Sequence, residues 1–427
     1  MHNDSLWRLN ATEAAELIQA RKFSSEALTG ACLERIARRE TTIEAWETLD
    51  PVGARSQAQM RDREAGHGPL HGIPVAVKDI IDVAGLPTRY GSPIHANAGA
   101  AVSDAACVAA ARRAGAVILG KTVTTEFAGA EPGKTRNPLN LAHTPGGSSS
   151  GSAACVADGM APLAFGTQTA GSIIRPAAYC GIVGFKPSFG WMDRGGVGVF
   201  SPSLDTIGLF SRSVADVARF FAALTGCPQT SPMACGPVRI GRLSGSPVAT
   251  ASVLAEQAVA LSLAKFSSHG AEIVDVVPPV SLVTLARTQH MVMAYETNQS
   301  LLQAQQAHPA LLSEKLKDLL ALGASMSRME YEAAQGIAME ARQSFASMMA
   351  GIDALIMPPA LGIAPYGLQD TGDPVFCRVW SLLHFPALTL PVLRHESGLS
   401  IGIQLVGAPA GDDRLLAAAH LAGTPDA

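Results

Sequence analysis

A run of glycine and serine in the middle of the chain restricts the fold more than any other segment. It reads Thr144-Pro-Gly-Gly-Ser-Ser-Ser-Gly-Ser-Ala-Ala154, and Gly166-Thr-Gln-Thr-Ala-Gly-Ser-Ile-Ile-Arg175 follows it. Glycine and serine bury little apolar surface, and glycine loses much conformational freedom on folding, so this run makes a poor core. It suits a place where backbone N–H groups surround a small polar ligand or a developing negative charge.

A lysine and two serines give this region a chemical interpretation. Lys78 ends the apolar run Ile73-Pro-Val-Ala-Val77 and lies seventy residues before Ser148. Burial beneath apolar residues lowers the pKa of a lysine, which can then act as a base. Serine hydroxyls in glycine-rich loops ordinarily bond to nearby backbone, and we expect this of the other serines in the run. Lys78, Ser148 and Ser172 together indicate a hydrolase that activates serine without histidine.

In order and spacing, these segments resemble those of the amidase signature family of hydrolases. Five further segments match the pattern of that family, and the resemblance covers most of residues 6–420: Gly181–Pro187, Ser203–Gly208, Asp353–Pro358, Phe385–Leu388 and Gly402–Gly407. The resemblance implies one large α/β/α domain around a mixed central sheet. It also implies an amidase, a C–N hydrolase acting on linear amides, that uses no metal or other cofactor.

The resemblance further implies a role for each residue of the catalytic triad. Ser172 is the nucleophile that forms an acyl-enzyme, Lys78 is the base, and Ser148 relays the proton between them. The family holds the peptide bond before the relaying serine in the cis form, and Gly147 precedes it here.

Candidate binding residues surround this triad. By the same resemblance, an oxyanion hole is formed by the backbone N–H groups of Thr169, Ala170, Gly171 and Ser172, where small side chains leave room for the substrate carbonyl. Substrate-contact candidates are Arg175, Gly147, Thr124 and Trp380. Trp380 is equally well explained as a core aromatic residue.

Arg175 marks a departure from the commonest family pattern. Many members have Asp where this chain has Gln168, and the arginine here falls three residues after Ser172. This arrangement resembles the short malonamidase-type branch, in which that arginine grips the free carboxylate of a small acid-amide. A bidentate guanidinium suits such a task. A buried arginine paired with an Asp or Glu of the fold explains the position equally well.

Helices alternate with short apolar strands along the first half of the chain, which favours an α/β fold. We expect helices within residues 12–38, with Thr12 and Ser24 as N-caps, and over residues 103–114 and 150–157. Strands are expected at residues 73–77, 116–119 and 161–165. Residues 251–350 carry long helical periods and predict helices that pack on the same sheet or form a cap over the site. We expect one domain over residues 1–427, with the signature core at about 66–210.

Two short patterns favour other enzymes at first sight. Gly115–Thr122 fits the phosphate-binding loop GxxxxGK[ST], but its four intervening residues are themselves the expected strand, so nucleotide binding is not predicted. Gly147–Gly151 fits GxSxG around Ser149, but a loop precedes it where a nucleophile elbow needs a strand.

Composition limits the partners. Apolar residues make up 48% of the chain and charged residues 16%, with a net charge of −4. These values indicate a large core and give no basic face for nucleic acid. Apolar runs are too short to span a membrane, and no secretion signal is expected. Seven scattered cysteines are typical of reduced thiols. We therefore expect a cytoplasmic enzyme, a homodimer, that binds a small-molecule amide.

Several alternative functions stay open at this point. The same serine chemistry serves urea-type, carbamate and aryl amide substrates. A tRNA-dependent amidotransferase subunit is disfavoured by the short chain and the absent basic face. A silent scaffold protein is disfavoured by the intact set of Lys78, Ser148 and Ser172.

Overall fold

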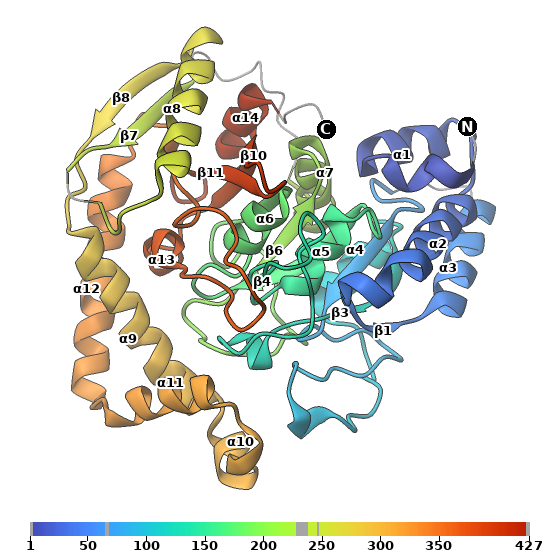
Figure 1. Ribbon diagram of the computed structural model, residues 1–427, viewed down its shortest axis with the longest axis horizontal. Coiled ribbons are helices and arrows are strands. Elements are labelled where there is room, and N and C mark those ends of the chain that lie inside the picture. Colours follow the sequence, from blue (N-terminus) through green and yellow to red (C-terminus); the bar gives the residue numbers. More distant parts are fainter. Residues whose placement is uncertain (1–2, 65–67, 228–237, 246, 424–427) are drawn as a thin grey trace.

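A mixed sheet of eleven strands runs through the computed structural model, which describes residues 3–64, 68–227, 238–245 and 247–423 (Figure 1). In spatial order the strands are β1 (Trp46–Leu49), β3 (Val117–Thr122), β2 (Pro74–Lys78), β4 (Leu163–Gln168), β6 (Thr206–Ser211), β5 (Val183–Lys186), β10 (Ala387–Arg394), β11 (Ser400–Val406), β9 (Ala354–Met357), β7 (Arg239–Leu243) and β8 (Glu272–Val276). This is the single α/β domain with a mixed sheet that the sequence predicts.

Strand directions bring the glycine- and serine-rich segment after β4 next to the carboxyl end of β2. β2 pairs in parallel with both β3 and β4, whereas β4 pairs antiparallel with β6. Parallel neighbours end at the same edge, so the carboxyl ends of β2 and β4 lie together there. Lys78 is the last residue of β2, and Gln168 is the last residue of β4.

Helices cover both faces of this sheet. Phe165 of β4 packs on Phe220 of one layer, with ring centroids 4.8 Å apart, whereas a Cβ on the next residue, Gly166, would meet Ser149 of the other layer. Successive strand side chains alternate between the two faces, so the architecture is α/β/α. The layer on the Phe220 side contains α4 (Ala106–Arg113), α7 (Val214–Thr225) and α14 (Asp412–Ala422), and the other contains α5 (Ser150–Ala157) and α6 (Ile174–Cys180).

The expected helices and strands of the first half are present, with shifted ends. The N-terminal helices are α1 (Ala11–Gln19) and α2 (Ser25–Ile43), followed by α3 (Pro51–Arg63). Ser24 caps α2 as predicted, but Asn10 and not Thr12 caps α1, in a capping box with Glu13. Residues Gly115–Thr122 contain β3 itself and follow α4, so the phosphate-loop pattern has no structural support.

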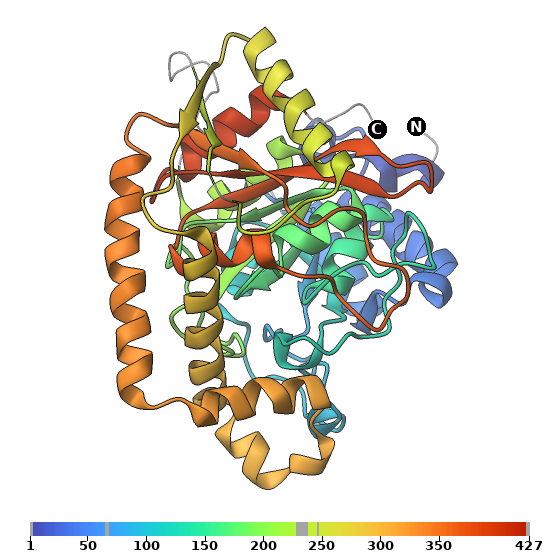
Figure 2. The same cartoon turned by 60° about the vertical axis from the view of Figure 1, so that its left-hand side comes forward.

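The predicted cap region is helical but not entirely so. Residues 251–350 begin with α8 (Val253–Ser268), which packs against β11, and with β8, which extends the sheet. The helices α9 (Leu282–Ser300), α10 (Leu302–Ala307), α11 (Glu314–Ser325) and α12 (Arg328–Met348) follow. Figures 1 and 2 show α9, α11 and α12 along one flank of the sheet, with α10 projecting furthest from it. The last helix before the final strands is α13 (Val375–Leu382).

Within the described residues, helices long enough to span a bilayer are not apolar enough to do so.

Candidate active site

Lys78 lies at the carboxyl end of β2 and has no exposed surface. Its Nζ donates to Ser148 Oγ at 2.7 Å and to Thr167 Oγ1 at 2.8 Å. Thr167 comes from β4, the parallel neighbour of β2, so strand pairing itself brings this second hydroxyl to the lysine. Sequence analysis missed Thr167, although its place beside the end of β2 follows once that pairing is known.

Burial dominates the charge state of this lysine. Desolvation lowers the pKa of Lys78 well below its ordinary value, and the distant carboxylate of Asp205 only partly opposes the shift. No salt bridge to Lys78 forms among the described residues. A lowered pKa favours the neutral amine, whose lone pair is what a base requires.

Ser148 stands at the entrance to α5, and the Gly147–Ser148 peptide bond is cis, as the resemblance implies. The neighbouring serines bond to backbone instead, as expected: Ser149 Oγ donates to Thr167 O at 3.2 Å, Ser150 Oγ to Val123 O at 3.4 Å and Ser152 Oγ to Phe165 O at 2.8 Å. Ser148 thus differs from them in having the lysine as its partner. Ser149 follows a loop and not a strand, which excludes a nucleophile elbow.

Residues Thr169 to Ser172 form the turn between β4 and α6, and all four carbonyl groups accept hydrogen bonds. The donors are Gln289 Nε2 to residue 169, Ser381 Oγ to residue 170, Arg175 N to residue 171 and Ser149 N to residue 172. The backbone N–H groups of the same four residues have no acceptor among the described residues. This turn is thus held by its carbonyls, and its N–H groups are left without a protein acceptor in the described part of the chain.

Two side chains brace this turn, and neither was predicted to do so. Gln168 Oε1 accepts from the backbone N of Ile173 and Ile174, at 2.9 and 3.1 Å. Its Nε2 donates to Ser381 Oγ at 3.1 Å, and Ser381 in turn donates to Ala170 O at 2.9 Å. Gln168 uses both ends of its amide, which an aspartate at this position could not do.

Gly171 needs to be glycine for a reason other than the predicted one. A Cβ here would meet Pro374 Cβ at 2.8 Å and Cys377 Cβ at 3.1 Å, at the start of α13. Close packing of the turn against that helix therefore excludes a side chain. Clearance for a substrate carbonyl is not needed to explain this glycine.

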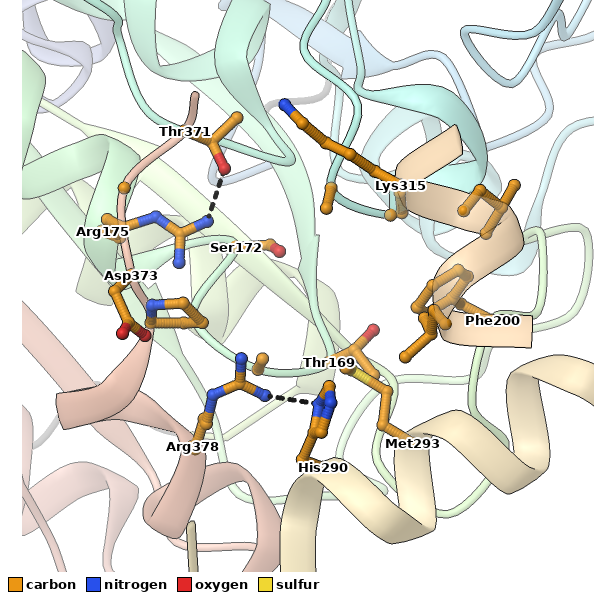
Figure 3. Close-up of a pocket in the computed structure, with 18 of the residues that line it drawn as sticks. Thr169, Ser172, Arg175, Phe200, His290, Met293, Lys315, Thr371, Asp373 and Arg378 are labelled. Atoms are coloured by element: carbon orange, nitrogen blue, oxygen red, sulfur yellow. Dashed lines mark hydrogen bonds between the residues drawn. The ribbon is translucent and has the colours of Figure 1, made fainter. Parts of the chain in front are cut away.

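A cavity of about 520 Å³ opens above Ser172 (Figure 3). Thr169, Ala170 and Arg175 join Ser172 in lining it, and α9 and α11 supply the opposite wall through residues such as Met293 and Leu319. Two helices of the region 251–350 thus contribute to the cavity wall. The described residues hold no group of three His, Cys, Asp or Glu side chains arranged for a metal ion.

Arg175 projects from α6 into this cavity and is 5% exposed. Its Nη2 donates to Gly147 O at 2.7 Å and to Thr371 Oγ1 at 3.2 Å, and its Nε and Nη1 are buried without a hydrogen-bond partner. No ion pair with an Asp or Glu forms within the described part of the chain. The alternative of a structural arginine neutralised by a carboxylate of the fold is therefore not observed.

Two predicted contact residues lie elsewhere, and these predictions are corrected. Thr124 is 2% exposed, donates to the carbonyl of Thr125 and does not line the cavity. Trp380 is buried between Phe345 and Phe385 and borders a different cavity, because its position on α13 directs it away from Ser172. Gly147 touches Arg175 through its carbonyl and is not a lining residue.

Comparison with known proteins identifies the family. The family model described as Amidase matches residues 27–416. The chain belongs to the amidase signature family. This amidase is an enzyme that hydrolyses C–N amide bonds.

Similar sequences and structures span nearly the whole amidase. The A subunit of a glutamyl-tRNA(Gln) amidotransferase from Roseiflexus castenholzii is 32% identical and covers 96% of this chain and 94% of its own. The native peptide amidase from Stenotrophomonas maltophilia has a TM-score of 0.83 and 29% identity, covering 97% of this chain and 96% of its own. A 6-aminohexanoate cyclic dimer hydrolase has a TM-score of 0.86 and 25% identity, covering 98% and 96%.

Proposed function

We propose that this amidase cleaves a small amide bearing a carboxylate, such as malonamate, through an acyl-enzyme on Ser172. The contact between the fully buried Lys78 amine and Ser148 Oγ at 2.7 Å carries the proposal, because it supplies a neutral base next to a relaying hydroxyl. Free N–H groups at Thr169, Ala170, Gly171 and Ser172 support the assignment of the oxyanion hole.

In each half of the proposed reaction, Lys78 takes up one proton through Ser148 and then returns it. Ser172 Oγ bonds to the amide carbonyl carbon while its proton passes to Ser148, and the Ser148 proton passes to Lys78 Nζ. The oxyanion receives hydrogen bonds from the free N–H groups. As the C–N bond breaks, the proton returns through Ser148 to the leaving nitrogen. Water then attacks the acyl-enzyme along the same path and restores the Ser172 hydroxyl.

The substrate carboxylate is assigned to Arg175. Arg175 lines the cavity three residues after Ser172, no carboxylate of the described chain neutralises it, and its Nε and Nη1 have no hydrogen-bond partner. These observations support a substrate carboxylate beside the scissile bond. A charge-assisted pair of this kind contributes about 1.5–3 kcal/mol. Amides of urea, carbamate or aryl type without a carboxylate would leave these donors unpaired.

An amidotransferase component that works on charged tRNA is the second candidate, since several relatives carry that name. The net charge of −4 gives little attraction for RNA. The two candidates differ in a simple assay, because a transferring enzyme would release ammonia from glutamine in preference to malonamate. Residence in the cytoplasm and assembly as a homodimer stay predictions, to be tested by fractionation and by light scattering.

Ammonia release from malonamate, malonamide, acetamide, benzamide, biuret and glutamine tests the proposal. We expect malonamate to be preferred, and Ser172→Ala to lose on the order of 10⁴-fold or more. Ser150→Ala is the matched control, because its hydroxyl makes only a long bond to backbone. Arg175→Met should cost roughly 10–100-fold on malonamate and far less on malonamide. Equal losses on both amides would show that Arg175 does not recognise the substrate carboxylate. Activity that survives Ser172→Ala would show that Ser172 is not the nucleophile.

A further inference from the structure

A second guanidinium faces the cavity above Ser172. Arg378 projects from α13, and its Nη1 donates to Gln289 Oε1 at 2.9 Å and lies 3.3 Å from His290 Nδ1 (Figure 3). Its Nε and Nη2 have no hydrogen-bond partner among the described residues. Arg378 therefore has donors available on the side that lines the cavity.

Arg378, like Arg175, has no carboxylate within ion-pair distance in the described part of the chain. Among carboxylates, Asp373 raises the pKa of both guanidiniums most, but it is exposed and its Oδ1 accepts from Val375 N at the start of α13. Arg175 in turn lowers the pKa of Arg378, after desolvation, because the two like charges face one cavity. Lys315, Asp318, Asp370 and Asp373 also line this cavity. None of these three carboxylates pairs with Arg175 or Arg378 among the described residues, so both guanidiniums can still take an anionic ligand.

Gln289 fixes Arg378 relative to the catalytic turn. Its amide oxygen accepts from Arg378, and its amide nitrogen donates to Thr169 O at 3.1 Å. Both ends of one buried amide are thus committed, so the guanidinium has a fixed position relative to the oxyanion hole.

His290 adds a neutral donor beside Arg378. Burial and the charge of Arg378 lower the pKa of His290, so the ring is neutral near pH 7. Since Nδ1 lies opposite a guanidinium N–H, Nδ1 is the acceptor and the proton resides on Nε2. Arg378 and His290 together resemble the donor sets that hold carboxylates.

The size of the cavity also argues for more than malonamate. Its volume of about 520 Å³ lies in the range of roughly 300–1,000 Å³ that suits drug-sized ligands. Malonamate held by Arg175 would fill a small part of it and leave Arg378 unpaired.

We propose that Arg378, supported by His290, binds a second acidic group, so that the substrate is a dianionic amide held by Arg175 at one end and by Arg378 at the other. This inference rests on the proposed function for the identity of the reaction and of the Arg175 site. It adds a specificity residue from α13 and names the substrate class.

Binding to the Ser172→Ala protein tests the second site without any turnover. Calorimetry compares the dicarboxylates from malonate to adipate with monocarboxylates of equal length. We expect the best dicarboxylate to bind at least tenfold more tightly than its monocarboxylate, and Arg378→Met to remove that advantage. Arg328→Met, on the exposed surface of α12, is the control. Equal binding of the two ligand classes, or an advantage that survives Arg378→Met, overturns the proposal.

Kinetics then distinguish this inference from the proposed function. N-malonylglycine is compared with N-propylmalonamate, which lacks the second carboxylate. We expect kcat/KM to favour N-malonylglycine at least tenfold in the wild type, with the ratio near one in Arg378→Met and intermediate in Arg378→Lys. A wild-type ratio near one, with Ser172-dependent hydrolysis intact, overturns the second site alone. Loss of Ser172 dependence overturns the proposed function, while the calorimetric result still decides the anion site.

Discussion

Lys78 is a side chain whose burial links chemistry to stability. In the unfolded chain its amine has an ordinary pKa, but in the native structure desolvation holds that pKa well below 10.5. Between the two values the unfolded chain binds more protons than the folded one, so native stability contributed by this residue rises with pH. The cost of keeping the amine neutral is therefore largest at low pH and disappears above about pH 10.5.

This linkage predicts the behaviour of Lys78→Met. The variant should lose hydrolysis, and its free energy of unfolding relative to wild type should fall steadily as pH rises from 7 to 10. Urea denaturation at several pH values measures the difference. Lys317→Met, an exposed lysine on α11, is the control and should show no such slope. A flat difference for Lys78→Met would mean that the buried amine stays protonated.

The pH dependence of hydrolysis gives an independent measurement at the same residue. A base must be unprotonated, so kcat/KM should decline as pH falls through the folded pKa of Lys78. Because that pKa is depressed, activity should persist well below the ordinary range of a lysine. A decline that begins near pH 10 would contradict a neutral lysine in the native enzyme.

The turn between β4 and α6 depends on side chains from other elements. Ser381 of α13 links Gln168 to the carbonyl of Ala170, and both of its hydrogen bonds are buried. Removing its hydroxyl leaves a buried amide donor and a buried carbonyl without a partner. Each such loss costs about 1–3 kcal/mol.

We therefore expect Ser381→Ala to destabilise the protein by about 2–6 kcal/mol and to lower kcat more than it raises KM. Displacement of the free N–H groups at residues 169–172 is the physical reason. Denaturant unfolding and steady-state kinetics measure the two effects. Ser347→Ala on exposed α12 is the matched control, since its hydroxyl only bonds back to Gln343 O. A loss of stability with unchanged kcat would show that α13 does not position the turn.

Elements with a clear local pattern, such as an apolar run between end signals, are predicted well from the sequence. β2, α4, β3 and α5 follow from apolar runs and end signals, and the segments carrying Lys78, Ser148 and Ser172 are recognisable one by one. β8 was missed, because its five residues include two acidic ones and it pairs only at the edge of the sheet.

Partners that come from far along the chain could not be predicted in the same way. Gln289, Ser381 and Arg378 enter the site through helix packing, and nothing in their own surroundings marks them. Thr167 lies within the segment Gly166–Arg175, but only the pairing of β2 with β4 brings it to Lys78. Of the two explanations that the sequence leaves open for Trp380, the structure shows the core aromatic residue, and only helix packing decides between them.

At the scale of the whole molecule, one carboxylate ties the helical cap to the sheet. Glu296 of α9 accepts from Ser201 Oγ at 2.6 Å and Ser203 N at 3.0 Å with one oxygen. Its other oxygen accepts from Tyr331 OH at 2.7 Å and Gln335 Nε2 at 3.2 Å, both on α12. Glu296 thus joins two cap helices to the loop that leads to Asp205, whose carboxylate accepts from Thr169 Oγ1 at 2.6 Å.

Glu296→Ala should destabilise the cap helices α9 and α12 more than the central strands of the sheet. We expect a loss of about 2–3 kcal/mol, faster hydrogen exchange in α9 and α12 than in β2 and β4, and a KM raised more than kcat is lowered. Hydrogen-exchange mass spectrometry and kinetics measure these effects. Glu340→Ala, exposed on α12, is the control. Uniform acceleration of exchange across the sheet would show that cap and sheet unfold as one unit.

The path of the chain through this cap bears on how substrate specificity diverges within the family. The chain leaves the sheet after β8 and returns at β9, and these two strands flank β7. The intervening helices form one wall of the cavity, while Lys78, Ser148 and Ser172 lie on segments that precede them. Mutation can reshape that wall without changing any of these three residues. Related enzymes can therefore keep one reaction while their substrates differ, and the solved relatives include a peptide amidase and a cyclic dimer hydrolase.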